Sequence, residues 1–159
     1  MNKRTIVNQI IEQLRIKAGL HLTAAKSAHA EATHEEAVAE DKYDTRGLEA
    51  SYLAAGQARQ MEETAAAIQA YASLFVKKFS PGDPVDLTAL VTLEVNRERQ
   101  VVFIGPAGGG VEVQAGKTRV LVITPQSPLG TLLMGKKKGD VFTRTVGPFD
   151  DQYRVVSIA

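Results

Sequence analysis

The chain has 159 residues, and its 19 lysines and arginines nearly balance 18 aspartates and glutamates, which leaves a formal net charge of +1. Autonomous binding to a nucleic-acid backbone needs a clustered positive surface, so we expect nucleic acid to be contacted mainly through a partner. There is no cysteine, which excludes disulfides and thiolate metal sites, and no segment approaches the ~20 consecutive apolar residues of a membrane span. These features predict a soluble, cytoplasmic protein that engages no membrane.

The first half of the chain has the composition of helix. Residues 5–79 contain no proline and many alanines, and alanine loses little entropy in a helix whereas proline breaks it. Apolar residues recur alternately every four and three positions, as in a coiled-coil seam. The first seam comprises Val7, Ile11, Leu14, Ala18, His21, Ala25, Ala28, Ala32, Glu35 and Ala39, and the second comprises Ala54, Ala58, Met61, Ala65, Ile68, Ala72, Phe75 and Phe79.

Between the two seams, residues 40–47 lose the apolar register and end in a glycine that allows a turn. This predicts an antiparallel coiled-coil hairpin, a slender arm that reaches roughly 50 Å. Its alanine-rich seam would bury little apolar surface, so its use would be reach. A hairpin that packs flat on its own domain, or that dimerises, fits the same pattern, and the oligomeric state stays open.

A break in composition follows at residues 80–84, where two prolines and a glycine cannot continue a helix. Beyond it the apolar period changes to two, which predicts about six short strands and one short helix at residues 129–134. A turn at residues 107–110 is predicted to close a hairpin. The predicted organisation is a helical-hairpin domain, residues 1–80, and an α+β domain, residues 81–159. We expect the fragment of residues 85–159 to fold alone.

The stretch SPLGTLLMGKKKGDVF, residues 127–142, combines Ser-Pro, a short apolar helix, Gly-Lys and then Gly-Asp before a strand. This ordered string resembles the C-terminal signature of the bacterial Gre transcript-cleavage factors (GreA/GreB-like), and the helical hairpin is similar to that family's coiled coil in position and length. The resemblance implies a small FKBP-like domain, with an antiparallel sheet and one short helix, that docks on RNA polymerase at the rim of its secondary channel. The coiled coil would enter that channel. The docking residues that it implies are Ser127, Pro128, Lys136 and Lys137.

Acidic residues gather around the predicted turn of the hairpin. Residues 31–49 carry seven carboxylates and two cations, a repulsion that is tolerable where solvent or a metal ion screens it. In the Gre family two tip acids help to hold a second Mg²⁺ in the polymerase active site, and Mg²⁺ prefers oxygen ligands. The resemblance implies Asp41 and Asp44 as metal ligands and catalytic residues, with Asp44 and Glu49 as the alternative register. Asp44 as a cap of the second helix also stays open.

The resemblance thus implies an accessory factor, not an enzyme, that has no cofactor of its own, shares Mg²⁺ with the polymerase and stimulates cleavage of backtracked RNA. A regulator that occupies the channel without stimulating cleavage is the first alternative, because the second tip acid is Asp where the family usually has Glu. A prolyl isomerase or chaperone is the alternative of another class, since FKBP-like folds host that activity. The run of lysines at residues 136–138 is either a solvated turn or a contact to an acidic polymerase surface or RNA phosphate.

Overall fold

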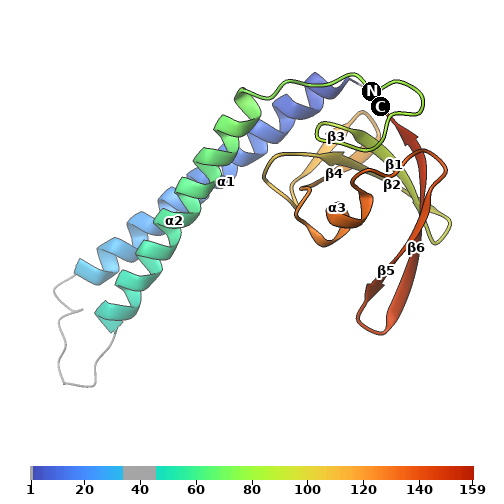
Figure 1. Cartoon of the computed structure of the whole chain (residues 1–159). Coiled ribbons are helices and arrows are strands. Elements are labelled where there is room, and N and C mark those ends of the chain that lie inside the picture. Colours follow the sequence, from blue (N-terminus) through green and yellow to red (C-terminus); the bar gives the residue numbers. More distant parts are fainter. Residues whose placement is uncertain (1, 34–45) are drawn as a thin grey trace. The chain divides into compact units, whose positions relative to one another are not determined.

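The computed structural model describes residues 2–33 and 46–159 (Figure 1). The elements are the helices α1 (Lys3–Thr33), α2 (Arg46–Ala72) and α3 (Pro128–Leu133), and the strands β1 (Leu90–Val95), β2 (Glu98–Ile104), β3 (Glu112–Ala115), β4 (Thr118–Ile123), β5 (Val141–Val146) and β6 (Phe149–Ile158). The predicted fold class, a helical hairpin followed by a sheet with one short helix, is confirmed.

The chain forms two compact units. One comprises residues 1–13 and 69–159 and is called the sheet unit below. The other comprises residues 14–68 and is called the arm. Compactness does not test independent folding, so the predicted division at residues 80 and 81 stays a prediction.

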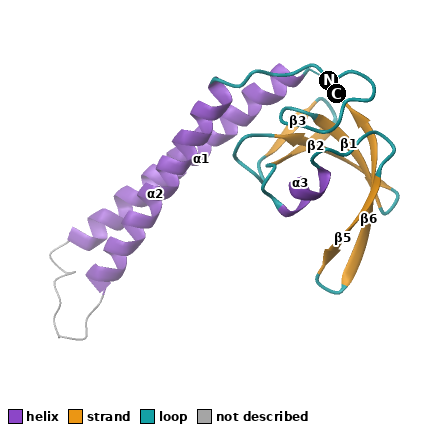
Figure 2. Ribbon diagram, in the orientation of Figure 1, coloured by secondary structure: helices purple, strands orange, loops and turns teal. Residues whose placement is uncertain are grey.

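The arm is a pair of antiparallel helices (Figure 2). The predicted seam of α1 is confirmed over its described part, because Leu14 and Ala28 are buried while the seam positions between them are half-buried. On α2 the seam is shifted, since Thr64 is buried and Ala65 is exposed. Thr64 can lie in the seam because its hydroxyl donates to the Gln60 carbonyl oxygen at 2.7 Å, so no polar group is left unpaired.

The second helix ends earlier than the seam pattern predicts. It stops at Ala72, and Phe75 is 85% exposed in the segment that follows. Hydrogen bonds to the sheet unit hold the chain on both sides of this helix end. Tyr71 donates to the Ala107 carbonyl oxygen at 2.8 Å, and the amide of Lys77 donates to the Thr88 hydroxyl at 3.0 Å.

The six-stranded sheet has the order β3-β4-β2-β1-β6-β5. All neighbouring strands pair antiparallel except β2 and β4, which run parallel. The antiparallel prediction therefore holds for every pair but one. The exception arises because β3 lies at the edge beyond β4, so the chain must cross from β2 to that edge before it returns as β4.

The turn at residues 107–110 was predicted as a hairpin turn, and that prediction is wrong. The chain does turn there, with the amide of Val111 donating to the Gly108 carbonyl oxygen at 3.1 Å, but the turn joins β2 to β3, which are not neighbours. The tight hairpin turn lies at Gly116 and Lys117. Gly116 has a φ of 66°, as the first central residue of a type II′ turn requires.

Both faces of the sheet carry buried side chains. On one face Val91, Leu93, Val102 and Ile104 form the main core with Leu129 and Leu133 of α3. Because side chains alternate along a strand, a second set of buried residues lies on the opposite face: Leu90, Phe103, Val113, Val120 and Val122.

The second set is covered from within the sheet unit. Ile6, Ile10 and Tyr71 belong to the same compact unit and are fully buried. A Cβ atom added to Gly105 would lie 3.0 Å from the Tyr71 ring and 3.0 Å from a Val122 methyl group, so the tyrosine lies on this face. Burial also raises the pKa of Tyr71 far above its ordinary value, which keeps the hydroxyl protonated as a hydrogen-bond donor.

Candidate functional site

The resemblance implied Asp41, Asp44 and Glu49 as the acids of the site. Asp41 and Asp44 lie outside the described residues, so their proposed roles stay predictions. Glu49 is described and exposed, in the first turn of α2, where a carboxylate interacts favourably with the helix dipole. Among residues 2–33 and 46–159, no group of three or more His, Asp or Glu side chains is placed to hold a metal ion.

The predicted docking residues Ser127 and Pro128 build the start of α3. Ser127 is the N-cap: its hydroxyl accepts from the Gly130 amide at 3.0 Å and donates to the Thr124 carbonyl oxygen at 2.7 Å. Pro128 occupies the first turn, where its missing N–H costs nothing. The pair therefore fixes the direction in which α3 leaves β4, and its contact with polymerase stays a prediction.

The local structure requires glycine at two positions of the same string. A Cβ atom on Gly130 would lie 1.9 Å from the Thr124 carbonyl oxygen, so only glycine lets α3 pack this close to the chain that precedes it. Gly135 has a φ of 77°, the left-handed conformation that ends a helix and that glycine adopts without strain. The string thus specifies one short helix of defined length.

The other two predicted docking residues, Lys136 and Lys137, lie in a turn that is bonded on both sides. The carbonyl oxygen of Lys136 accepts from the Val85 amide at 2.8 Å, and the amide of Lys137 donates to the Asp140 carboxylate at 2.8 Å. Within the described residues, none of the lysines at positions 136–138 has an ion-pair partner. A rigid turn therefore presents cationic side chains beside α3.

An exposed apolar surface that the sequence analysis missed lies next to this turn. β5 contacts α3, and the register of the β5–β6 hairpin places Phe142 opposite Tyr153 and Val146 opposite Phe149. Because Tyr153 belongs to the core on the α3 side, alternation puts Val146 and Phe149 on that same side. We call Phe142, Val146 and Phe149 the apolar docking surface.

The outer side chains of this surface are exposed. Phe149 is 71% exposed and Val146 44%, while the rings of Phe142 and Tyr153 stack with their centres 5.2 Å apart. Apolar residues gathered on one side and flanked by charge mark interaction surfaces. The signal in the sequence was Phe149 immediately after the Gly-Pro turn, since a large aromatic residue at a hairpin end has no neighbouring strand to bury it.

Nearby carboxylates are engaged in local hydrogen bonds. Asp150 accepts from the Thr145 hydroxyl at 2.7 Å, and Asp151 accepts from the Asn96 amide group at 2.7 Å. Asp140 holds the lysine turn. These acids thus shape the loops around the apolar docking surface.

Comparison with known proteins gives no family model and no curated relative that matches. Solved structures that resemble the chain include GreA factor homolog 1 (Gfh1) of Thermus thermophilus, with 23% identity, 94% of each chain covered and a TM-score of 0.39. Gfh1 of Thermus aquaticus has 22% identity, 92% of each chain covered and a TM-score of 0.39. The prokaryotic transcription elongation factor GreA/GreB from Nitrosomonas europaea has 19% identity over 60% of this chain and 78% of its own, with a TM-score of 0.38. Superpositions this loose assign no family to the chain.

None of the described helices combines the length and the apolar character needed to cross a membrane.

Proposed function

We propose that the chain is an accessory factor of RNA polymerase that docks at the secondary channel through the sheet unit and carries the tip of the arm toward the active centre. The observation that carries this proposal is the string at residues 127–142, which resembles the Gre signature. In the structure it forms one capped helix and one rigid lysine turn. Both lie beside the apolar docking surface, which gives the proposed interface an apolar centre and a charged rim.

The chemistry proposed for the tip is cleavage of backtracked RNA by the polymerase. Asp41 and Asp44, or Asp44 and Glu49, would supply carboxylate oxygens to a Mg²⁺ shared with the polymerase active site. Two-metal hydrolysis needs negative ligands that place the ions on the attacking and leaving oxygens. The factor itself would be no enzyme, since it lends ligands to a catalytic site on its partner.

The test is RNA cleavage in a deliberately backtracked elongation complex, with and without the full chain. Stimulated cleavage is expected, and Asp41→Ala with Asp44→Ala should abolish it while polymerase binding changes by less than about threefold. A parallel pair of substitutions at Asp44 and Glu49 decides the register. Full cleavage by both double variants would remove the metal-ligand assignment.

A second candidate function is a channel regulator that does not stimulate cleavage. The feature that favours it is Asp44 in the second acid position. An aspartate side chain is shorter than a glutamate side chain and would extend less far toward a metal ion. In that case the wild-type chain would bind polymerase, compete with a cleaving factor and leave the RNA intact.

The isomerase alternative finds less support in the fold. Phe103 is fully buried on one face of the sheet, Phe142 and Tyr153 stack on each other, and Phe149 is exposed at a hairpin end. These aromatic residues do not gather around a common cavity, whereas an isomerase site requires an apolar, aromatic-lined pocket.

A further inference from the structure

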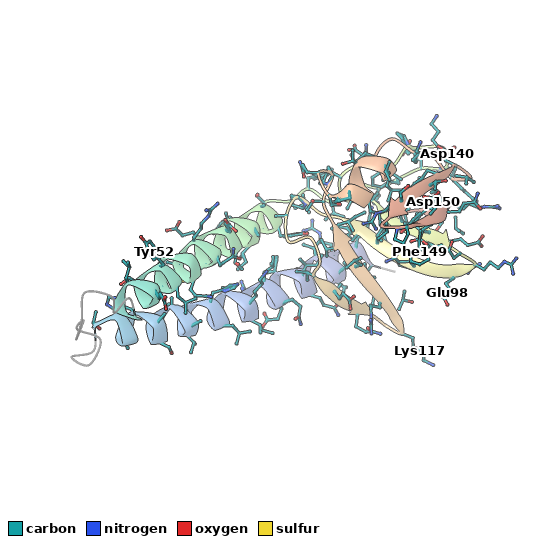
Figure 3. The ribbon with its side chains drawn as sticks, turned by 90° about the horizontal axis from the view of Figure 1, so that it is seen from below. Tyr52, Glu98, Lys117, Asp140, Phe149 and Asp150 are labelled. Atoms are coloured by element: carbon teal, nitrogen blue, oxygen red, sulfur yellow. The ribbon has the colours of Figure 1, made fainter. Side chains whose placement is uncertain are left out.

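The sheet contains a notch between β2 and β4. Their parallel pairing begins at Val101 with Val120, yet β2 starts at Glu98 and β4 starts at Thr118. Before the pairing begins, each strand is bonded only on its far side, β2 to β1 and β4 to β3. The two hairpins therefore diverge, and Figure 3 shows Glu98 and Lys117 at their separate ends.

The notch is a cavity of about 630 Å³, within the usual range of ~300–1,000 Å³ for ligand sites. Its lining combines strand backbone, cationic side chains and two half-buried apolar residues: Thr92, Arg99, Gln100, Val101, Glu112, Lys117, Thr118, Arg119 and Leu121. All of them belong to the sheet unit. The cavity lies between β2 and β4, whereas β5 is the edge strand on the other side of the sheet. The cavity shares no residue with the apolar docking surface.

The notch carries positive charge. Arg99, Lys117 and Arg119 line it together with one carboxylate, Glu112. That carboxylate lies 3.4 Å from the Arg119 guanidinium, and within the described residues neither Arg99 nor Lys117 forms an ion pair. A chain with a net charge of only +1 thus gathers three cations and one carboxylate in one groove.

The backbone of the notch decides between kinds of anionic ligand. The facing edges of residues 98–100 and 118–119 present N–H donors and C=O acceptors that no neighbouring strand uses on that side. A polypeptide strand supplies both complementary groups, whereas phosphates supply acceptors alone. Single-stranded nucleic acid also relies on aromatic side chains for base stacking, and the lining of the notch has none.

We propose that the notch binds an extended acidic segment of a partner protein, which adds as a short strand between β2 and β4. Backbone hydrogen bonds to the two open edges hold it in place, as in other cases of β-strand addition. Side chains alternate along such a strand, so one set of positions carries carboxylates toward Arg99, which shares its side of the sheet with Val101, and the other set packs on Leu121 on the opposite side. This interaction is independent of cleavage and of the proposed polymerase docking surface.

The test is fluorescence anisotropy of the full chain with a labelled peptide in which glutamate alternates with valine. Saturable binding is expected, and Arg99→Gln with Lys117→Gln should weaken it roughly tenfold. The matched control is Arg97→Gln with Lys78→Gln, which removes the same charge outside the notch and should change the affinity less than about twofold. Amide NMR shifts on binding should concentrate at residues 98–100 and 118–119.

Three results would overturn the proposal. The first is no saturable binding up to about 1 mM peptide. The second is equal binding by a peptide whose alternate amides are N-methylated, because strand addition requires those donors. The third is a mixed-sequence RNA oligonucleotide that binds more tightly than the peptide and loses affinity in the Arg99/Lys117 variant, which would make the notch a nucleic-acid site.

Discussion

At the scale of single residues, the signature string is explained largely by local sterics and hydrogen bonding. Ser127 caps α3, Pro128 opens it and Gly135 ends it. What the order of residue types could not predict is the need for Gly130, because that need arises from the carbonyl oxygen of Thr124 across the turn. Because these residues have local structural roles, the resemblance to the Gre signature partly reflects a shared local structure.

Gly130→Ala should destabilise the sheet unit by about 2–3 kcal/mol, because the new methyl group has no room against the Thr124 carbonyl oxygen and the main-chain atoms must shift. Urea unfolding of the full chain measures the loss. Gly109→Ala is the matched control, since its Cβ atom would lie 3.6 Å from the nearest atom, an ordinary contact. Equal stability of the two variants would contradict this explanation of Gly130.

Asp86 gives a pH-dependent prediction. The Leu87 amide, which donates at 2.7 Å, and the Lys77 ammonium group at 3.2 Å lower the pKa of Asp86. Because the folded-state pKa lies below the unfolded value of about 3.9, the stabilisation is present above that value and is lost as the pH falls through the folded-state pKa. The carboxylate is 48% exposed, so the contribution is at most about 1 kcal/mol.

Asp86→Asn should therefore be slightly less stable than the wild type at neutral pH, and the difference should disappear in strong acid. Urea unfolding at the two pH values measures it. A difference that stays constant with pH would show that the Asp86 charge is irrelevant to stability.

At the scale of elements, the β5–β6 hairpin presents large apolar side chains that the fold leaves uncovered. Periodicity predicted both strands but said nothing about the exposure of Phe149, because exposure depends on whether another element covers that side. Since no strand in the described part of the chain lies beyond β5 and α3 is only six residues long, the end of the hairpin remains open for a partner.

Phe149→Ala should weaken polymerase binding at least about fivefold while the free energy of unfolding changes by less than ~0.5 kcal/mol. The reason is that a ring 71% exposed in the free protein contributes little to the fold and gains its burial only on docking. Competition binding to polymerase provides the measurement. Phe75→Ala is the control, because Phe75 is 85% exposed and lies outside the apolar docking surface; a larger effect at Phe75 would move the interface elsewhere.

At the scale of the whole molecule, the start of the first helix is part of the sheet unit. Lys3 donates to the Lys77 carbonyl oxygen, and its ammonium group lies 4.6 Å from the centre of the Phe79 ring. Ile6 and Ile10 are fully buried in this unit. A fragment of residues 85–159 therefore lacks cover for one face of its sheet, which makes it a poor candidate for independent folding.

Ile10→Ala should destabilise the sheet unit by about 2–4 kcal/mol, the usual cost of truncating a buried side chain. Hydrogen exchange should show the loss of protection at the amides of β2 and β4, far away in sequence. Ile16→Ala is the control, since Ile16 is 51% exposed and should cost less than ~0.5 kcal/mol. Loss of protection in the helices alone would mean that the sheet is stable without this cover.

The sequence by itself determined the helical hairpin, the seam of α1, the number of strands and the short helix α3. These features depend on neighbours within a few positions, through side-chain periodicity, Pro and Gly geometry, and caps. Only the tertiary structure decided the end of α2, the parallel pairing of β2 with β4, the notch and the exposure of Phe149. Each of these depends on which distant strand or loop supplies a hydrogen-bond partner or a covering side chain, and no local pattern encodes that partner.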